Sequence, residues 1–128
     1  MKKFLLIFFL FSSNLFSQDL VCIQDDQEID SFCIYKNTIK KSKNKVVYWG
    51  VRSFEKPQPL NNLEYLSTMM KVEVDCDLMR MRFLVMKNHK SPMGKGKVIY
   101  QTQDGFEGDW LDPVPNNQFF ILNKTLCK

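Results

Sequence analysis

The chain has 128 residues, with 18 basic and 14 acidic side chains and a formal net charge of +4. This length suits one domain with a modest hydrophobic core. So small an excess of positive charge does not indicate a nucleic-acid-binding protein, and we expect no nucleic acid among the partners. Beyond the N-terminal segment, no apolar stretch is long enough to span a membrane.

The first 17 residues predict a secretory signal peptide. Lys2 and Lys3 form a basic start, and the apolar run over residues 4–11 is too short to span a bilayer. Ser17 offers a small residue for cleavage. An uncleaved N-terminal anchor is the alternative. We expect cleavage after Ser17, which leaves residues 18–128 as one domain of an exported protein in the periplasm or at the cell surface.

The N-terminal part of the mature chain predicts an arm followed by a hairpin. Residues 18–28 are polar and acidic without periodicity, and we interpret them as an arm held by Cys22. Residues 29–39 predict a first strand. Residues 46–54 are dense in β-branched and aromatic side chains, which predicts a second strand. The charged segment 40–45 is then the turn that joins the two strands.

The central part predicts a loop and two further strands. Pro57 and Pro59 favour a connecting loop over residues 55–62, because proline cannot donate a hydrogen bond to a neighbouring strand. Residues 65–77 alternate apolar and charged side chains, which predicts a half-buried strand. Residues 79–86 alternate again and predict its antiparallel neighbour after a tight turn.

The C-terminal part predicts a short strand and a helix. Residues 89–97 are a loop, residues 98–102 a strand, and residues 103–115 a long turn-rich connection that carries Trp110. Apolar side chains then recur with helical spacing over residues 117–126, after an asparagine that can cap a helix. We therefore expect class α+β, an antiparallel meander sheet of five or six strands with a C-terminal helix packed on it.

Four cysteines lie in the mature chain and allow three disulfide pairings. Cysteines of exported proteins are usually paired, and we expect the disulfides Cys22–Cys33 and Cys76–Cys127. Free thiols or a zinc site are the alternatives. Zinc sites usually use close-spaced cysteine pairs, and no two cysteines here are separated by two residues. We therefore expect no metal centre and no cofactor.

Several short motifs follow one another over residues 29–127 in a recognisable order. In chain order they are Trp49 after a basic turn, Tyr65 and Ser67 before Asp75-Cys76, Arg80 and Arg82, Met93-Gly94-Lys95-Gly96 before Val98, Trp110 followed by Pro113 and Pro115, and Leu126-Cys127. This order resembles the surface-adhesin protein E family of exported bacterial proteins. Asn116 departs from the family, which has a small residue after the last proline, and Cys22 and Cys33 are additional to its pattern.

The resemblance implies a small sheet-plus-helix domain, a disulfide equivalent to Cys76–Cys127, and a binding role. The family's namesake is an adhesin that binds host matrix proteins and has been linked to haem. Most members are functionally uncharacterised, so the resemblance alone does not assign adhesion to this chain.

Candidate ligand-binding residues fall into three groups. The basic turn supplies Lys40, Lys41 and Lys43, the strand after Cys76 supplies Arg80 and Arg82, and Trp110 and His89 stand apart. The lysines could contact host glycans or anionic lipid headgroups, and the arginines could form a basic patch for an anionic ligand.

Each candidate also has a purely structural explanation. A solvated hairpin tip carries lysines in any case. Lys71, Glu73 and Asp75 could lie across the hairpin from the two arginines and pair with them. Trp110 could fill the core. His89, the lone histidine, is most simply a surface residue of a loop, with haem or metal ligation as the alternative.

We expect an exported, non-enzymatic binding or interaction domain, with a host extracellular matrix protein or another envelope protein as partner. The alternative is a periplasmic, envelope-associated structural module, or a binder of a small ligand such as haem, without a role in adhesion. A hydrolase ranks below both, because no nucleophile or metal motif is visible. An exposed strand edge would also permit a homodimer.

Overall fold

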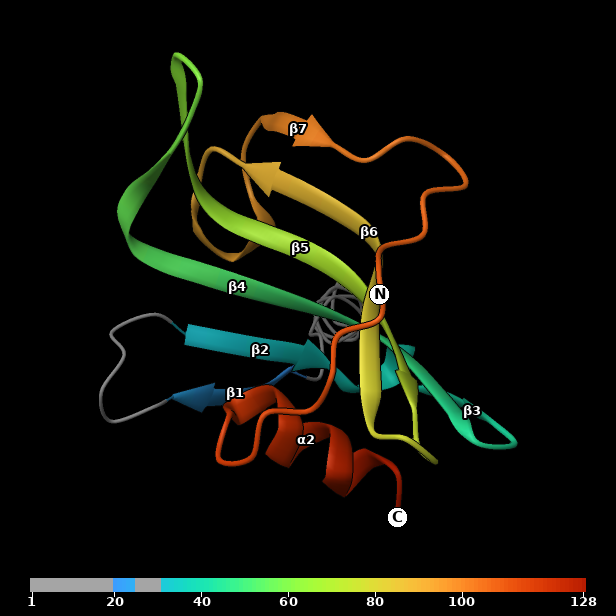
Figure 1. The fold of residues 1–128 in the computed structure, drawn as a ribbon. Coiled ribbons are helices and arrows are strands. Elements are labelled where there is room, and N and C mark those ends of the chain that lie inside the picture. The colour runs from blue at the N-terminus through green and yellow to red at the C-terminus, as the bar shows by residue number, and fades with distance from the viewer. Residues whose placement is uncertain (1–19, 25–30) are drawn as a thin grey trace, which may run out of the picture.

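The computed structural model describes residues 20–24 and 31–128. The expected signal peptide and its cleavage site therefore lie outside the described residues. The described strands form one antiparallel sheet in the order β1-β2-β4-β5-β6-β7, with β3 paired to β4 (Figure 1). The strands are β1 (Leu20–Gln24), β2 (Ser31–Tyr35), β3 (Lys40–Ser42), β4 (Lys45–Leu60), β5 (Leu63–Asp75), β6 (Arg80–His89) and β7 (Val98–Gln101).

Among the described residues there is one α-helix, α2 (Gln118–Leu126), near the C-terminus, and two short 3-10 turns, η2 (Lys36–Thr38) and η3 (Pro92–Gly94), lie between strands. The α+β class and the C-terminal helix are confirmed, and Asn117 caps that helix by accepting from the Phe119 backbone N–H at 2.8 Å. Over the described ranges the sheet has seven strands instead of five or six. The two additional strands are β1 and β3.

The expectation of an irregular arm over residues 18–28 is wrong for its described part. Leu20–Gln24 pairs along its whole length with β2, and Cys22 lies directly opposite Cys33. A strand this short shows too little alternation to be recognised from its sequence. Its pairing with a neighbouring strand and its disulfide determine the conformation instead. Likewise, the basic turn is shorter than expected, because Lys40–Ser42 pairs with β4.

The expectation of a loop over residues 55–62 is also wrong. β4 continues to Leu60, and only Asn61 and Asn62 separate it from β5. β2 begins at Ser31, opposite Ser53, so no described strand pairs with β4 on that side beyond Ser53. Proline is tolerated in such an edge segment because its missing N–H would not be used. The resulting β4–β5 arm projects beyond the rest of the sheet (Figure 1).

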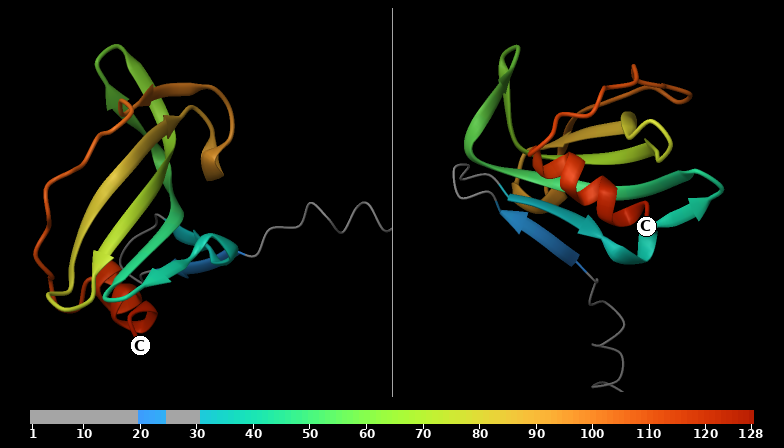
Figure 2. Two further views of the ribbon diagram at one scale, coloured as in Figure 1. Left: turned by 90° about the vertical axis from the view of Figure 1, so that its right-hand side faces the viewer. Right: turned by 60° about the horizontal axis from the view of Figure 1, so that its bottom comes forward.

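The sheet has one face covered by α2, here called the helix face, and an opposite outer face (Figure 2). Alternation along β5 assigns the side chains, with Val72 and Val74 fully buried on the helix face and Glu73 on the outer face. Phe32 and Phe119 pack their rings at 4.5 Å between centroids. The core therefore lies between the sheet and the helix.

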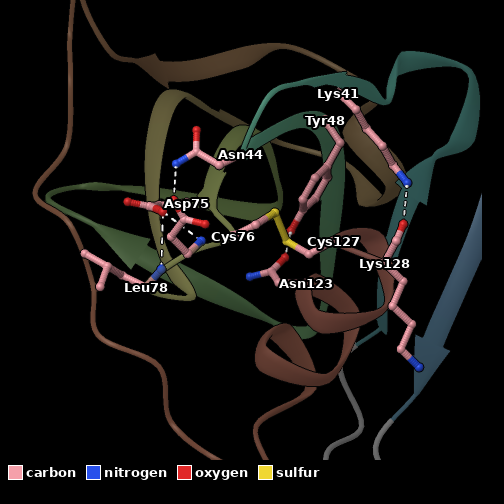
Figure 3. The surroundings of a disulfide bond; sticks show 10 residues. Lys41, Asn44, Tyr48, Asp75, Cys76, Leu78, Asn123, Cys127 and Lys128 are labelled. Carbon is pink, nitrogen blue, oxygen red and sulfur yellow. Dashed lines mark hydrogen bonds between the residues drawn. A yellow bond between two sulfur atoms is a disulfide. The ribbon is translucent and has the colours of Figure 1, made fainter.

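A buried hydrogen bond and a disulfide hold α2 on the sheet. The Tyr48 hydroxyl donates to the Asn123 Oδ1 atom at 3.0 Å, and both residues are buried. Burial raises the pKa of the Tyr48 phenol well above its usual range. The Cys76–Cys127 disulfide joins the end of β5 to the end of the helix beside this pair (Figure 3). At this end of the molecule, α2 is thus held on the sheet by both a covalent bond and a buried hydrogen bond.

Both expected disulfides are confirmed, and all four cysteines are paired. Cys22–Cys33 links β1 to β2 with a sequence separation of 11, and Cys76–Cys127 has a separation of 51. The first bond secures an edge strand, while the second secures the helix.

We predict that the two disulfides differ in their contribution to stability. In the chain-entropy model, the free energy of unfolding falls by about 4 kcal/mol in the Cys76→Ser/Cys127→Ser variant and by about 3 kcal/mol in Cys22→Ser/Cys33→Ser. The loss is larger for Cys76–Cys127 because this bond closes the longer loop. Guanidinium unfolding of the two variants and the parent measures both losses. A larger loss for the Cys22–Cys33 bond would contradict the assignment of the main structural role to Cys76–Cys127.

Candidate functional site

The connection between β7 and α2 returns along the free edge of β6 and places Trp110 there. Met81 and Leu111 exchange two backbone hydrogen bonds, of 3.1 and 2.7 Å, and the Gly108 N–H donates to the Phe83 carbonyl at 2.9 Å. A Cβ atom on Gly108 would lie 3.0 Å from the Phe83 carbonyl oxygen, so the close approach favours glycine. The chain is thereby fixed on both sides of Trp110.

Three cationic side chains surround the Trp110 ring, and we call this group the Trp110 cluster. The distances to the ring centroid are 4.5 Å from Arg82 Cζ, 5.2 Å from Arg80 Cζ and 5.4 Å from Lys45 Nζ. Cations at such distances are attracted by the negative face of an indole. Trp110 is half-buried at the sheet edge, so it is not the core residue that one expectation suggested.

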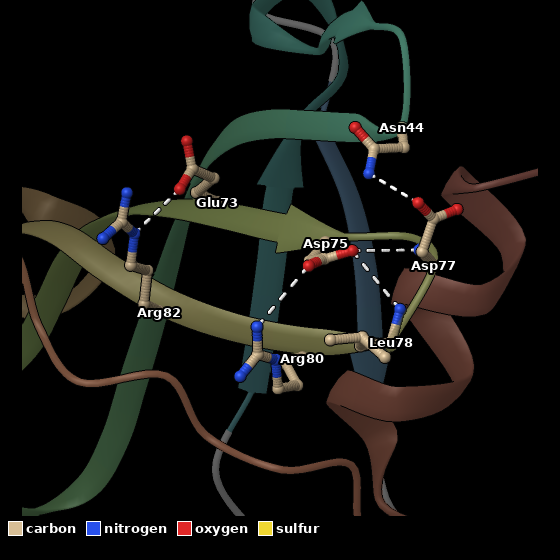
Figure 4. Close-up of polar contacts among 7 residues, drawn as sticks. All are labelled: Asn44, Glu73, Asp75, Asp77, Leu78, Arg80 and Arg82. Carbon is tan, nitrogen blue, oxygen red and sulfur yellow. Dashed lines mark hydrogen bonds and ion pairs between the residues drawn. The ribbon is translucent and has the colours of Figure 1, made fainter.

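Carboxylates from β5 pair with the two arginines (Figure 4), and Glu107 of the β7–α2 connection adds a contact to Arg82. Arg82 Nε donates to Glu73 at 2.8 Å and Arg82 Nη1 to Glu107 at 3.3 Å, while Arg80 lies 3.7 Å from Asp75. The strand register places Glu73 opposite Arg82 and Asp75 opposite Arg80. Cross-strand pairing therefore explains the positions of both arginines. Because Arg82 is already paired with carboxylates, it is not free to bind an anionic ligand.

Asp75 has a second structural task in the turn between β5 and β6. Its Oδ1 atom accepts from the backbone N–H groups of Asp77 and Leu78 at 3.0 and 3.3 Å (Figure 4). Asn44, from the turn before β4, donates to the Asp77 side chain at 2.7 Å. The two turns at this end of the sheet are thus tied together.

Residues 40–45 form a hairpin tip at the same end, here called the lysine hairpin. Lys40, Lys41 and Lys43 are exposed on it, and Lys41 donates to the backbone oxygen of Lys128 at 3.4 Å. Within the described ranges, the side chains of Lys40 and Lys43 have no hydrogen-bond or ion-pair partner. Lys45 links the lysine hairpin to the Trp110 cluster.

His89 does not belong to this arrangement. It is the last residue of β6, half-buried and not in a loop as expected, and its Nδ1 atom lies 3.2 Å from the Gly96 carbonyl oxygen. Arg80 and His89 occupy opposite ends of β6, about 30 Å apart at the usual strand rise. Among the described residues, no group of three or more His, Cys, Asp or Glu side chains is placed to hold a metal ion.

An apolar pocket that the sequence did not indicate lies on the other side of the same edge. It is bounded by β6, residues 111–117 and α2, and has a volume of about 370 Å³. Its walls include Met81, Phe83, Leu111, Val114 and Phe119. The pocket exists because the β7–α2 connection crosses from the sheet edge to the helix, a path that no local sequence pattern predicts.

Comparison with known proteins identifies the family. The model of the family described as surface-adhesin protein E matches residues 21–128. The chain belongs to the surface-adhesin protein E family. No curated protein matches it, and in the described part of this family member no helix is long and apolar enough to cross a membrane.

Two solved structures of protein E from Haemophilus influenzae share the fold of this family member. A selenomethionine form aligns with a TM-score of 0.63 and 12% identity over 83% of this chain and 84% of that one. A crystal structure from a non-typeable strain aligns with a TM-score of 0.59 and 12% identity over 87% and 85% of the respective chains. At this identity the likeness establishes the fold alone.

We predict an energetic coupling between Trp110 and Arg82. In a double-mutant cycle of unfolding free energies with Trp110→Leu and Arg82→Met, the coupling is about 0.5–1 kcal/mol, since the cation lies over the indole face. The control cycle pairs Trp110→Leu with Lys87→Met, because the Lys87 ammonium lies near Trp49, 5.9 Å from that ring centroid. Equal coupling in the two cycles would remove the specific role of the Trp110 cluster.

Proposed function

We propose that this member of the surface-adhesin protein E family is an exported, non-enzymatic adhesin that binds an acidic surface of a host extracellular matrix protein through the lysine hairpin. Family membership supports a binding role. We choose the lysine hairpin as the binding surface because its lysine side chains differ from the arginines in their pairing. Arg82 contacts two carboxylates, whereas the side chains of Lys40 and Lys43 have no partner within the described ranges.

Rigid support makes the lysine hairpin suitable for recognition. Its second strand is the start of β4, which pairs with β5 from Lys45 onward. The Cys76 backbone N–H donates to the Asn44 carbonyl at 2.8 Å, so the hairpin turn is tied to the residue that carries the disulfide. A backbone fixed in this way loses less freedom on binding, and the charge of the lysines attracts an acidic partner over about a Debye length.

The remaining candidate residues receive supporting roles in this proposal. Arg80, Arg82 and Trp110 stabilise the sheet edge beside the lysine hairpin instead of contacting the ligand directly. His89 is remote from the proposed surface and carries no part of the function. The proposal needs no cofactor.

We predict that neutralising the lysine hairpin weakens adhesion selectively. The Lys40→Gln/Lys41→Gln/Lys43→Gln variant binds its matrix protein about tenfold more weakly, since exposed ion pairs contribute about 0.5 kcal/mol each. Surface plasmon resonance against a panel of immobilised host matrix proteins measures this, at several salt concentrations. Binding by the parent also weakens as salt rises, because the interaction is electrostatic.

The matched control is Lys90→Gln/Lys95→Gln/Lys97→Gln, which removes the same charge. These three lysines are exposed around η3, which is fastened near the other end of the sheet by hydrogen bonds to Ser53 and Ser67. The control binds within about twofold of the parent. If both triple variants lose affinity equally, binding depends on overall charge and the lysine hairpin is not the site.

We predict that the mature protein is displayed at the cell surface. Protease treatment of intact cells then degrades it, while a periplasmic marker protein in the same cells remains intact. Full protection of this protein until the outer envelope is permeabilised would rule out adhesion. That outcome would favour the alternative, a periplasmic envelope-associated module.

A further inference from the structure

The pocket bounded by β6, residues 111–117 and α2 combines apolar walls with one buried polar group. Met81, Phe83 and Phe119 line its interior, and its volume of about 370 Å³ lies within the range of small-molecule sites. Val114 and Leu111 also line it and are 61% and 46% exposed. The lining is therefore accessible to solvent through an apolar rim.

The buried polar group is the amide of Asn123. Asn123 lines the pocket and is only 2% exposed. Its Oδ1 atom accepts from the Tyr48 hydroxyl, while its Nδ2 atom donates only to the Met81 sulfur, at 3.6 Å, in the described part of the chain. A thioether is a weak acceptor, so the amide retains the capacity to donate to a better one.

The charge around the pocket limits what it can hold. Of the described residues in the lining, Asp112 is the only charged one, and it is exposed. No lysine, arginine or histidine in the part of the chain that the structure describes lines the pocket to neutralise a bound anion. A negatively charged ligand would therefore lose its hydration and gain no cationic partner.

We propose that this pocket binds a small neutral amphiphile, an alkyl or aryl chain with one hydroxyl or carbonyl oxygen that accepts from the Asn123 amide. Taking about 30 Å³ for each water-sized group, the volume corresponds to roughly a dozen non-hydrogen atoms. The apolar chain packs against Met81, Phe83 and Phe119. This site lies on the helix side of the β6 edge and is independent of the lysine hairpin.

Methionine methyl groups provide a direct test with the full mature protein. Met79 and Met81 line the pocket, whereas Met69 and Met86 do not. With methionine methyl groups labelled with carbon-13, titration with octan-1-ol shifts the Met79 and Met81 resonances saturably and leaves the Met69 and Met86 resonances in place. Shifts that are spread over all four methionines, or that never saturate, would overturn the proposal.

The chemistry of the ligand is tested with matched probes. Octan-1-ol binds at least tenfold more tightly than octanoate, which carries a negative charge, and at least threefold more tightly than octane, which has no acceptor. In the Tyr48→Phe/Asn123→Leu variant, which removes both partners of the buried hydrogen bond, the preference for octan-1-ol over octane disappears. Equal affinity of the parent for octanol and octane would refute the role of the amide.

The location is tested with two substitutions of similarly exposed apolar residues. Val114→Glu weakens octan-1-ol binding at least tenfold, because Val114 lines the pocket. Ile121→Glu, on the exposed side of α2 and 56% exposed, leaves binding within twofold. Unfolding midpoints confirm that both variants are folded. Equal effects of the two changes would place the site elsewhere. If the Met79 or Met81 resonances instead shift when the protein is diluted without ligand, the pocket is occupied by a second copy of the chain and the proposal is overturned.

Discussion

The hydrogen bond between Tyr48 and Asn123 holds the two layers of the molecule in register. It connects β4 to the middle of α2, and both residues are buried. Leaving either group without its partner would cost about 1–3 kcal/mol, which is more than the bond itself contributes. The bond therefore selects one position of the helix over others that would bury a similar apolar area. The walls of the apolar pocket depend on that position, since α2 forms one of them.

The β6 edge separates two kinds of chemistry. On its outer side, the Trp110 cluster gathers charged groups that largely satisfy one another, with the unpaired lysines next to it. On its helix side, the same stretch of β6 presents Met81 and Phe83 to an apolar space. The alternation of side chains along a strand produces both from adjacent residues. The β7–α2 connection runs back along this edge and contributes to both sites. It supplies Trp110 to the Trp110 cluster and Val114 to the apolar pocket.

Local patterns in the sequence predicted the parts of the fold that depend on local chemistry. The alternation around Glu73 identified β5 and its buried face, and an asparagine followed by helical spacing identified α2. Both disulfides were also predicted correctly. The β1 strand and the far half of β4 were missed because pairing with neighbours overrides the composition of short or proline-containing segments. The Trp110 cluster combines residues of three distant segments, namely β4, β6 and the β7–α2 connection, so no sequence spacing could have indicated it. The same holds for the pocket.

The prolines of the β4–β5 arm restrict how that arm can associate with other chains. Pro57 and Pro59 are two residues apart, which places both missing N–H groups on the same edge of the strand. An incoming strand would find acceptors there without the donors that a regular ladder requires. Such positions protect protruding hairpins from runaway strand addition and fibre formation. The protein can thus extend a long two-stranded arm into solvent, and any contact with a partner along that edge must be made by side chains.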